Sequence, residues 1–202
     1  MEKRIVFATA NEGKMIEIRE ILADLGVAIY SMKEVGIEMD IIEDGNTFED
    51  NALIKARAVA ELLPDDIILA DDSGLEIDFL DGEPGVHTAR FGGVNTSYKE
   101  KMQLLLDKLQ GVPKEKRGAR FVCVIAAIFP DRSEELTRDT IEGRIAFEVI
   151  GEYGFGYDPI FYLPEFACTT AQLKPEKKHE LSHRGKALRG MRKILEKRAK
   201  IA

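Results

Sequence analysis

The sequence predicts an α/β fold built on a mixed β-sheet, and two observations carry this prediction. Residues 4–31 read as a strand, a loop, a helix and a second strand, which is a typical α/β opening. Residues 119–129 read as a long apolar strand, and 135–145 can return antiparallel to it after a turn at 130–132. The 202 residues suit one large domain or a two-lobed single domain, because no repeat, low-complexity run or linker divides them.

Composition narrows the classes of partner. The net charge of −7 argues against a nucleic-acid-binding surface, which needs a basic face. No apolar run approaches the ~18 residues of a membrane span, and the apolar run at 5–10 is too short for a signal peptide. Cys123 and Cys168 lie far apart without metal-ligand spacing. We therefore expect a cytoplasmic protein with a buried thiol at Cys123 and neither nucleic acid nor membrane as a partner.

The first strand, 4–8, leads through the loop 9–14 into the first helix. The loop does not fit the Walker pattern, since Met15 stands where Ser or Thr is required. A strand that opens onto a helix N-terminus is nevertheless a natural anion site, to which Thr9 and Asn11 can add donors and Lys14 a charge. Apolar residues follow at helical spacing, Gly26 closes the helix, and 28–31 is a second strand. The apolar positions are Met15, Ile18, Leu22 and Leu25.

The second helix follows an acidic turn at 41–45, which contains Glu43. Thr47 is expected to cap it, with Asp50 at the third helical position as an imperfect capping box. Pro64 marks its end. Its predicted buried stripe comprises Ala52, Ala56, Val59, Ala60 and Leu63.

The stretch 67–77 is the one around which the chain is organised. Four apolar residues, 67–70, read as a buried strand that delivers Asp71, Asp72 and Ser73 at its exit. Neighbouring strand side chains point to opposite faces, so one aspartate is expected to be structural and the other to face a site. The alternative is an ordinary capping turn over 71–74, because Asp-Ser-Gly is common turn chemistry.

Loops and one further helix complete the middle of the chain. The loop 84–93 contains His87 and Arg90, and we interpret His87 as a surface residue. Ser97 is expected to cap a helix with an apolar side of Met102, Leu105, Leu106 and Leu109.

The last fifty residues add a loop of unusual composition and a final helix. The loop 151–159 is rich in glycine and aromatic residues, which suggests either a stacking surface or a loop packed on its own rings. Ser182 is expected to cap the final helix, with Leu188, Met191 and Leu195 on its apolar side. Basic residues concentrate here and most are interpreted as a solvated face. They are Lys174, Lys177, Lys178, Arg184, Lys186, Arg189, Arg192 and Lys193.

Four stretches, in this order, resemble the inosine triphosphate pyrophosphatase family, which acts on non-standard purine nucleotides. They are Thr9-Ala10-Asn11-Glu12-Gly13-Lys14, Asp71-Asp72-Ser73-Gly74, Phe155-Gly156-Tyr157-Asp158 and Ser182-His183-Arg184. Thr47-Phe48 with Asn51-Ala52 and Lys55-Ala56, and Pro84-Gly85-Val86, resemble the same family. The first loop usually reads Thr-Gly-Asn in that family, so Ala10 would be strained if its position required a positive φ.

The resemblance implies a fold, a reaction and partners. Residues 1–202 would form a single two-lobed domain with a long mixed sheet flanked by helices and the active site in the cleft between the lobes. The reaction would be Mg²⁺-dependent hydrolysis of ITP, dITP, XTP and dXTP between the α and β phosphates. The products would be the monophosphate and pyrophosphate, and the protein would be a cytoplasmic homodimer that clears damaged purines from the nucleotide pool.

The resemblance also assigns roles at the phosphate end of the substrate. Glu43 and Asp72 would hold Mg²⁺, which prefers one or two carboxylates plus phosphates and water. Asp72 would also act as the general base toward the attacking water, a role that typically contributes about 10²–10⁴-fold. Lys14 and Lys178 would neutralise phosphate oxygens. Thr9, Asn11, the N–H groups at Gly13-Lys14 and the Ser73 hydroxyl would complete the phosphate contacts.

The remaining predicted residues would recognise the base. Phe155, beside Gly156, and Tyr157 offer a stacking face, which is indifferent to base identity. His183 and Arg184 would donate to the 6-oxo group of hypoxanthine or xanthine, where adenine presents an amino donor. Asp158 would accept from a ring N–H. These residues do not explain how guanine is rejected.

Three alternatives remain in view. A relative that hydrolyses modified pyrimidine triphosphates would lack a use for His183-Arg184 and Phe155. A nucleotide sensor without catalysis would leave Glu43 and Asp72 without a chemical role. An aspartyl-phosphate phosphatase normally has two aspartates separated by one residue, whereas Asp71 and Asp72 are adjacent.

Overall fold

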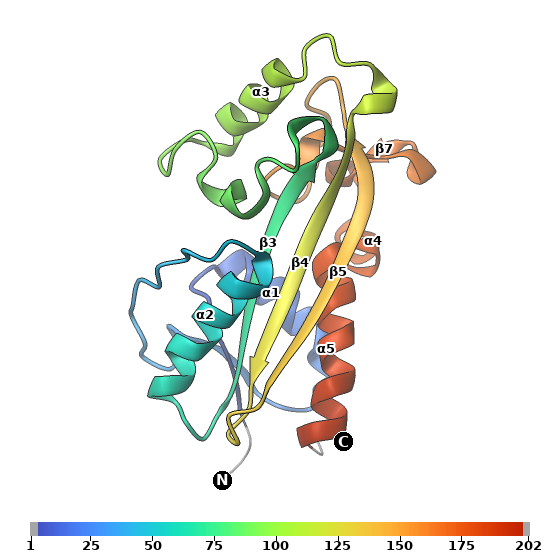
Figure 1. The fold of residues 1–202 in the computed structure, drawn as a ribbon. Coiled ribbons are helices and arrows are strands. Elements are labelled where there is room, and N and C mark those ends of the chain that lie inside the picture. The colour runs from blue at the N-terminus through green and yellow to red at the C-terminus, as the bar shows by residue number, and fades with distance from the viewer. Residues whose placement is uncertain (1–3, 200–202) are drawn as a thin grey trace. The chain divides into compact units, whose positions relative to one another are not determined.

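The computed structural model describes residues 4–199 and has an α/β architecture with a mixed sheet, as the sequence predicted (Figure 1). Over these residues the sheet has seven strands in the order β2-β1-β3-β4-β5-β6-β7. Strand β1 (Ile5–Phe7) pairs in parallel with β2 (Ile29–Ser31) and β3 (Ile67–Ile77). Strand β6 (Phe161–Leu163) pairs antiparallel with β5 (Glu134–Ile145) and β7 (Cys168–Thr169).

The chain divides into two compact units, each assembled from separate segments. Unit 1 comprises Met1–Asp72, Cys123–Asp139 and Arg184–Ala202, and unit 2 comprises Ser73–Val122 and Thr140–His183. Strands β3, β4 (Gly118–Ile128) and β5 each have one part in unit 1 and the other in unit 2.

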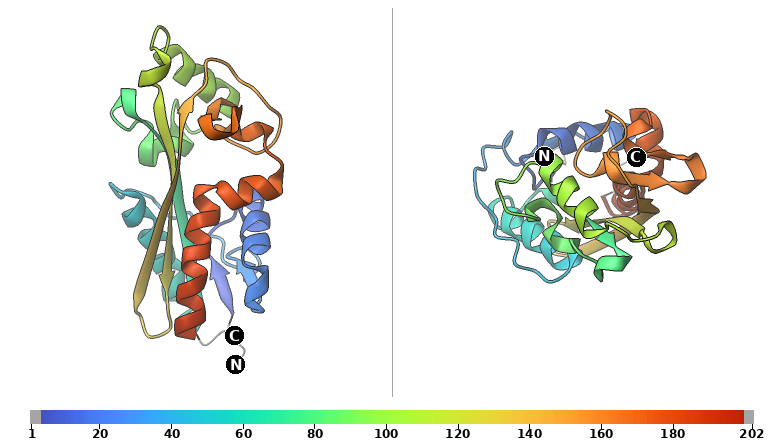
Figure 2. Two further views of the ribbon diagram at one scale, coloured as in Figure 1. Left: turned by 90° about the vertical axis from the view of Figure 1, so that its right-hand side faces the viewer. Right: turned by 90° about the horizontal axis from the view of Figure 1, so that it is seen from above.

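Unit 1 packs helices on both faces of its part of the sheet (Figures 1 and 2). Helices α1 (Glu12–Ile21) and α5 (His183–Ala199) lie side by side on one face, and α2 (Phe48–Leu62) covers the other. The predicted caps of the first two helices are present, because Asn11 accepts from the Lys14 N–H and Thr47 from the Asp50 N–H.

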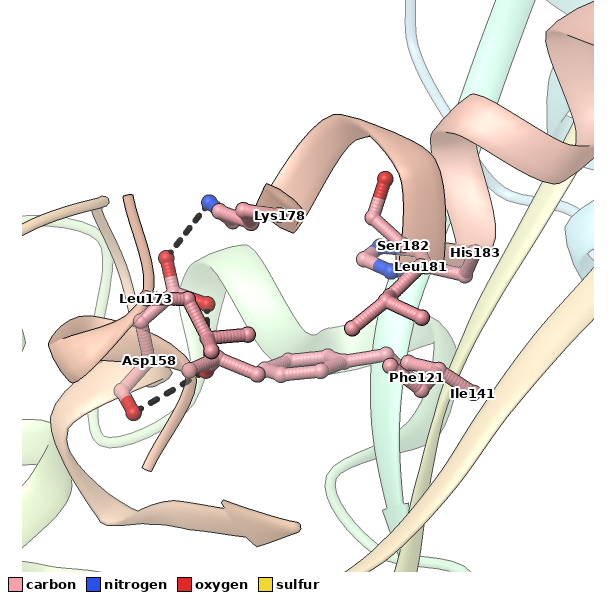
Figure 3. A pocket seen from close by; sticks show the side chains of 9 residues that line it. Phe121, Ile141, Asp158, Leu173, Lys178, Leu181, Ser182 and His183 are labelled. Atoms are coloured by element: carbon pink, nitrogen blue, oxygen red, sulfur yellow. Dashed lines mark hydrogen bonds and ion pairs between the residues drawn. The ribbon is translucent and has the colours of Figure 1, made fainter. Parts of the chain in front are cut away.

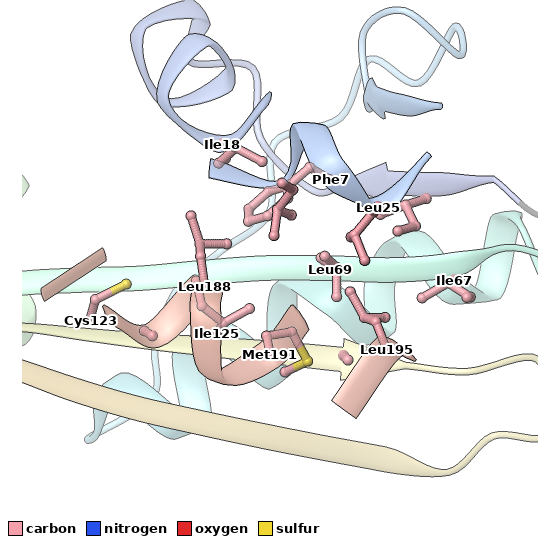
Figure 4. Close-up of a cluster of buried hydrophobic side chains, with 14 of the residues drawn as sticks. Phe7, Ile18, Leu25, Ile67, Leu69, Cys123, Ile125, Leu188, Met191 and Leu195 are labelled. Carbon is pink, nitrogen blue, oxygen red and sulfur yellow. The ribbon is translucent and has the colours of Figure 1, made fainter. Parts of the chain in front are cut away.

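The core of unit 1 on the α1–α5 face draws on distant parts of the chain (Figure 4). Side chains from β1, α1, β3, β4 and α5 meet there. They include Phe7, Ile18, Leu69, Ile125, Leu188, Met191 and Leu195, and Cys123 lies among them as a buried free thiol. The positions predicted to be apolar in the first and last helices therefore do face the core.

Strand β3 decides against one alternative left open by the sequence. The capping turn over 71–74 does not form, because β3 runs unbroken from Ile67 to Ile77. A turn would satisfy the backbone of Asp-Ser-Gly locally, but β3 is hydrogen-bonded to β4 in the sheet, although its pairing with β1 ends at Leu69. Tertiary pairing therefore overrides the local preference for a turn.

Unit 2 carries one longer helix and many short elements. Helix α3 (Tyr98–Lys108) begins at Ser97 with a full capping box to Glu100. Helix α4 (Pro175–Leu181), β6 and β7 are too short to leave a periodic pattern, and sequence reasoning missed them. Short 3₁₀ segments fill the connections. They are Asp78–Leu80, Gly85–Arg90, Lys114–Lys116, Asp158–Ile160, Pro164–Phe166 and Thr170–Gln172, with Ala23–Leu25 in unit 1.

No helix within residues 4–199 is both long enough and apolar enough to cross a membrane.

Candidate functional site

Strand alternation in β3 separates the two adjacent aspartates of unit 1. Asp71 points to the face covered by α1 and α5, where it contacts Lys14 and Arg184. Asp72 points to the α2 face, where its Oδ1 lies 3.7 Å from Lys55 Nζ. The expectation that the two carboxylates cannot share one pocket is met by this geometry.

Asp71 is the centre of a buried ionic network. Lys14 Nζ lies 3.0 Å from its Oδ1 and 2.9 Å from its Oδ2, and Arg184 Nη2 lies 3.4 Å from Oδ2. Burial alone would raise the pKa of this carboxyl, but Lys14, Arg184 and Lys55 outweigh burial and hold the pKa well below its usual range. Asp71 therefore stays ionised and fixes the Lys14 ammonium at the start of α1.

Arg184 departs from the solvated face predicted for most of the C-terminal basic residues. It is only 2% exposed, and its Nη1 donates to Glu17 Oε2 at 2.6 Å. Burial would lower the pKa of this guanidinium, but Asp71 and Glu17 raise it above its ordinary value. Arg184 thus ties α5 to α1 and β3, and its contact with the base remains a prediction.

The pKa of Asp72 is shifted in the opposite direction from that of Asp71. Burial raises the pKa of this carboxyl to about 6, with a further contribution from Glu43, although Lys55 and the side-chain amide of Asn51 lower it. A carboxyl with a pKa near neutrality is suited to proton transfer at physiological pH. Adjacent residues of one strand are therefore a permanently charged anchor and a titratable group.

Lys55 joins the two carboxylates that the sequence proposed as metal ligands. Its Nζ donates to Glu43 Oε2 at 2.7 Å and also lies 3.7 Å from Asp72 Oδ1. Burial would lower the pKa of this ammonium, but Asp71, Asp72 and Glu43 raise it. Sequence reasoning gave Lys55 no role, although a lysine in the middle of an otherwise apolar helix stripe was the available signal.

The turn that carries Glu43 is held against the start of α2. The Gly45 N–H donates to Asn51 Oδ1 at 2.9 Å, and Asn51 is completely buried. Asn51 therefore holds this turn against α2, and its amide also lowers the pKa of Asp72. Its role was likewise not recognised from sequence.

Side-chain hydrogen bonds order the loop between β1 and α1, and its binding of an anion stays a prediction. Asn11 Oδ1 accepts from the Lys14 N–H at 3.1 Å, and Thr9 Oγ1 accepts from the Asn11 N–H at 3.2 Å. Over residues 4–199 the non-glycine residues with positive φ are Asp81, Arg132 and Ala167. Ala10 is therefore unstrained, and the backbone of this loop does not need a glycine there.

A second group of predicted residues meets in unit 2 around Asp158 (Figure 3). Asp158 Oδ2 accepts from Lys178 Nζ at 2.7 Å and from the Phe155 N–H at 2.8 Å. Its Oδ1 accepts from Thr170 Oγ1 at 2.8 Å. Asp158 thus orders the loop that carries Phe155 and holds Lys178 over that loop.

The aromatic side chains of this loop have different surroundings. The Phe155 ring is 48% exposed, with Lys178 Nζ 4.6 Å from its centroid. The Tyr157 ring is 2% exposed, packs edge-on against Tyr98 and donates its hydroxyl to Thr88 O at 3.0 Å. Phe155 is therefore the more exposed of the two rings, and contacts of Phe155 and Tyr157 with substrate stay predictions.

His183 lies at the wall of a small pocket with an apolar floor. Its ring stacks on that of Phe121, with 5.0 Å between the ring centroids and 16° between the ring planes. Sequence reasoning missed this contact. The pocket brings together three predicted site residues, Asp158, Lys178 and His183. Its other lining residues are Phe121, Ile141, Thr170, Leu173, Leu181 and Ser182.

A model of the Ham1 family matches residues 5–194. The chain belongs to the Ham1 family. It is 45% identical over 195 residues to a dITP/XTP pyrophosphatase of Caldanaerobacter subterraneus subsp. tengcongensis, with 96% of this chain and 97% of the relative covered. It is 43% identical to the dITP/XTP pyrophosphatase of Bacillus subtilis, with coverage of 96% and 98%.

Solved Ham1 structures have the same fold. The Staphylococcus aureus Ham1 protein superposes with a TM-score of 0.87 at 41% identity, covering 96% of this chain and 98% of that one. A Ham1 protein from Coxiella burnetii gives a TM-score of 0.89 at 40% identity, with coverage of 96% and 99%. The family and the mixed α/β fold implied by the sequence motifs are confirmed.

The carboxylates of this Ham1 family member suit a magnesium ion. Within residues 4–199 no group of three or more His, Cys, Asp or Glu side chains could hold a metal ion alone. Glu43 and Asp72 share Lys55 as a neighbour, so two carboxylate groups converge on one region. Mg²⁺ usually takes one or two carboxylates and completes its shell with phosphate oxygens and water, so these residues fit it.

Proposed function

We propose that this chain hydrolyses ITP, dITP, XTP and dXTP to the monophosphate and pyrophosphate, and so removes non-standard purines from the nucleotide pool. The observation that carries the proposal is near-full-length identity of about 45% to proteins named dITP/XTP pyrophosphatases. The two environments of Asp71 and Asp72 support it, because one carboxyl anchors a phosphate-binding cation and the other can exchange a proton.

The triphosphate would be held at the start of α1 and by cations. The Gly13 N–H lies at the positive end of the α1 dipole, where phosphate binds readily, whereas the Lys14 N–H already donates to Asn11 Oδ1. Lys14 would neutralise phosphate oxygens while Asp71 fixes its position. Thr9, Asn11, Ser73 and Lys178 would supply the remaining phosphate contacts.

Mg²⁺ would be held by Glu43 and Asp72, and it would supply charge neutralisation at the phosphates and acidify bound water. Asp72 would take the proton from the water that attacks the α-phosphorus. With a pKa of about 6, its carboxyl is largely ionised at neutral pH and still basic enough to accept that proton. Lys55 would balance the charge of the two carboxylates.

The base would stack on Phe155, beside Gly156 and Tyr157. His183 and Arg184 would donate to the 6-oxo group, and Asp158 would accept from a ring N–H. Adenine would leave such buried donors unpaired, which costs about 1–3 kcal/mol each. We further propose that the protein is a cytoplasmic homodimer that acts without nucleic acid or membrane partners. Light scattering of the purified protein can test the dimer.

A pyrophosphate-release assay across ITP, XTP, GTP, ATP and modified pyrimidine triphosphates, with and without Mg²⁺, tests the function. We expect release from ITP and XTP in the presence of Mg²⁺ and much slower release from ATP. Asp72→Asn should keep the fold and lose about 10²–10⁴-fold in kcat. Asp65→Asn, an exposed aspartate near the start of β3, is the matched control and should retain activity.

Two outcomes would overturn the proposal. Tight ITP binding without pyrophosphate release would indicate a sensor, and preference for a pyrimidine triphosphate would assign a different substrate class. Wild-type-like turnover in Asp72→Asn would remove this residue from the mechanism.

A further inference from the structure

Thr88 occupies a junction in unit 2 between the strand that carries Ser73 and the loop that carries Phe155. It lies in the 3₁₀ segment Gly85–Arg90 and is buried. His87 and Arg90 of the same segment are exposed, and the sequence predicted this for His87. Among the described residues of this segment, Thr88 is the one buried polar residue, and its side chain points inward.

On one side, Thr88 completes the hydrogen bonding of β3. Pairing of β3 with β1 ends at Leu69, so a different partner must satisfy the same edge of the strand further along. Thr88 Oγ1 accepts from the Leu75 N–H at 2.8 Å and lies 2.6 Å from Gly85 O, to which it donates. A hydroxyl can accept and donate at once, and an isosteric valine can do neither.

On the other side, Thr88 holds the base loop. Its backbone O accepts the Tyr157 hydroxyl at 3.0 Å, and the Tyr157 ring is locked by edge-on packing against Tyr98. Tyr157 lies two residues after Phe155, the exposed ring of the loop. Leu75 lies two residues after Ser73. A single residue thus links the backbone at Leu75, near a predicted phosphate contact, to the side chain of Tyr157, near the predicted base contact.

We propose that Thr88 is a positioning residue that sets the spacing between the phosphate-binding and base-binding parts of unit 2. This inference rests on the proposed function, because it assumes a ligand that occupies both parts at once. Its consequence is specific. Loss of the Thr88 hydroxyl should weaken binding of a nucleotide that spans both parts, and should leave fragments that occupy only one part unaffected.

The test compares Thr88→Val with the wild type on ITP and on two fragments, inosine and pyrophosphate, used as competitive inhibitors. We expect kcat/KM for ITP to fall about 10–100-fold, since small displacements of positioned groups have effects of this size. The inhibition constants of inosine and pyrophosphate should change by less than about twofold, which is a small difference in binding free energy. Tyr157→Phe, which keeps the ring and removes the hydroxyl, should show the same pattern.

Two control variants separate positioning from general loss of structure. Thr88→Ser keeps the hydroxyl and should recover activity close to that of the wild type. Thr96→Val makes the same substitution at a threonine whose hydroxyl bonds only Gly92 O among its described contacts, and it should be silent. All assays are run well below the melting temperature of the least stable variant.

The outcomes are distinguishable. Unchanged kcat/KM in Thr88→Val, or fragment inhibition constants that rise as much as KM, would overturn the positioning role while leaving the pyrophosphatase function intact. Failure of the wild-type protein to split ITP would overturn the proposed function, and this inference with it.

Discussion

Asp71 and Asp72 show how far neighbouring residues of one strand can differ in chemistry. Asp71 is surrounded by three cations, which more than compensate for its burial and depress its pKa. Asp72 shares Lys55 with Glu43, and the effect of burial outweighs that of this cation, so its pKa rises to about 6. The alternation of strand side chains is what delivers them to different neighbours.

The raised pKa of Asp72 predicts a pH-dependent stability in the absence of divalent metal. Ionising this carboxyl costs the folded state free energy, so its contribution to stability is fully present below about pH 4 and lost as pH rises through 6. Asp72→Asn should therefore be roughly 1–3 kcal/mol more stable than the wild type at pH 8, with a gain that vanishes near pH 4. Urea unfolding in EDTA across this range measures it, with Asp65→Asn as the control. A variant less stable than the wild type at pH 8 would contradict the assignment.

At the scale of elements, the turn before α2 requires a glycine at position 45 because it lies so close to the start of the helix. Gly45 is close to the start of the helix, and a Cβ placed there would lie 2.6 Å from Asp50 Cβ and 2.7 Å from Asn51 Oδ1. These distances are too short for any side chain. The close approach allows the Gly45 N–H to bond Asn51 and brings Glu43 to Lys55.

Gly45→Ala should therefore displace Glu43 from its partner without unfolding the protein. Since residues that orient metal ligands typically change metal affinity 10–100-fold, we expect the Mg²⁺ concentration at half-maximal activity to rise by about tenfold or more. A magnesium titration of pyrophosphate release measures this shift. Gly190→Ala in α5 is the control, because its Cβ would meet Thr137 at an ordinary 3.4 Å. If Gly45→Ala and the wild type depended equally on magnesium, this turn would have no role in positioning a metal ligand.

At the scale of the whole chain, unit 1 is held together by residues far apart in sequence. Leu188 from α5 is fully buried in the same cluster as Ile18 from α1 and Ile125 from β4. No continuous segment of unit 1 contains this core, so its last helix is as necessary to the fold as its first strand.

Leu188→Ala should consequently destabilise the protein by about 2–5 kcal/mol, the usual cost of a large-to-small substitution that leaves a cavity. Leu104→Ala removes the same atoms from the exposed side of α3 and should cost less than about 1 kcal/mol. Chemical unfolding of the two variants gives the comparison. Similar losses at both positions would mean that α5 contributes little to the core.

Sequence alone determined the features that depend on local physics. The apolar spacing of the first and last helices, the caps at Thr47 and Ser97 and the long strand ending near residue 128 follow from periodicity and hydrogen-bonding chemistry within a few residues. The same local patterns, through the four motifs, were sufficient to place the chain in its family.

Tertiary structure alone decided the features that depend on distant partners. Asp-Ser-Gly became strand because β3 continues through it as a neighbour of β4, and Arg184 became a buried ion-pair partner because Glu17 and Asp71 surround it. Lys55, Asn51 and Thr88 gained their roles in the same way, from contacts with residues that only folding brings near. Electrostatic and hydrogen-bonding energies depend on distance in space, and a sequence records only distance along the chain.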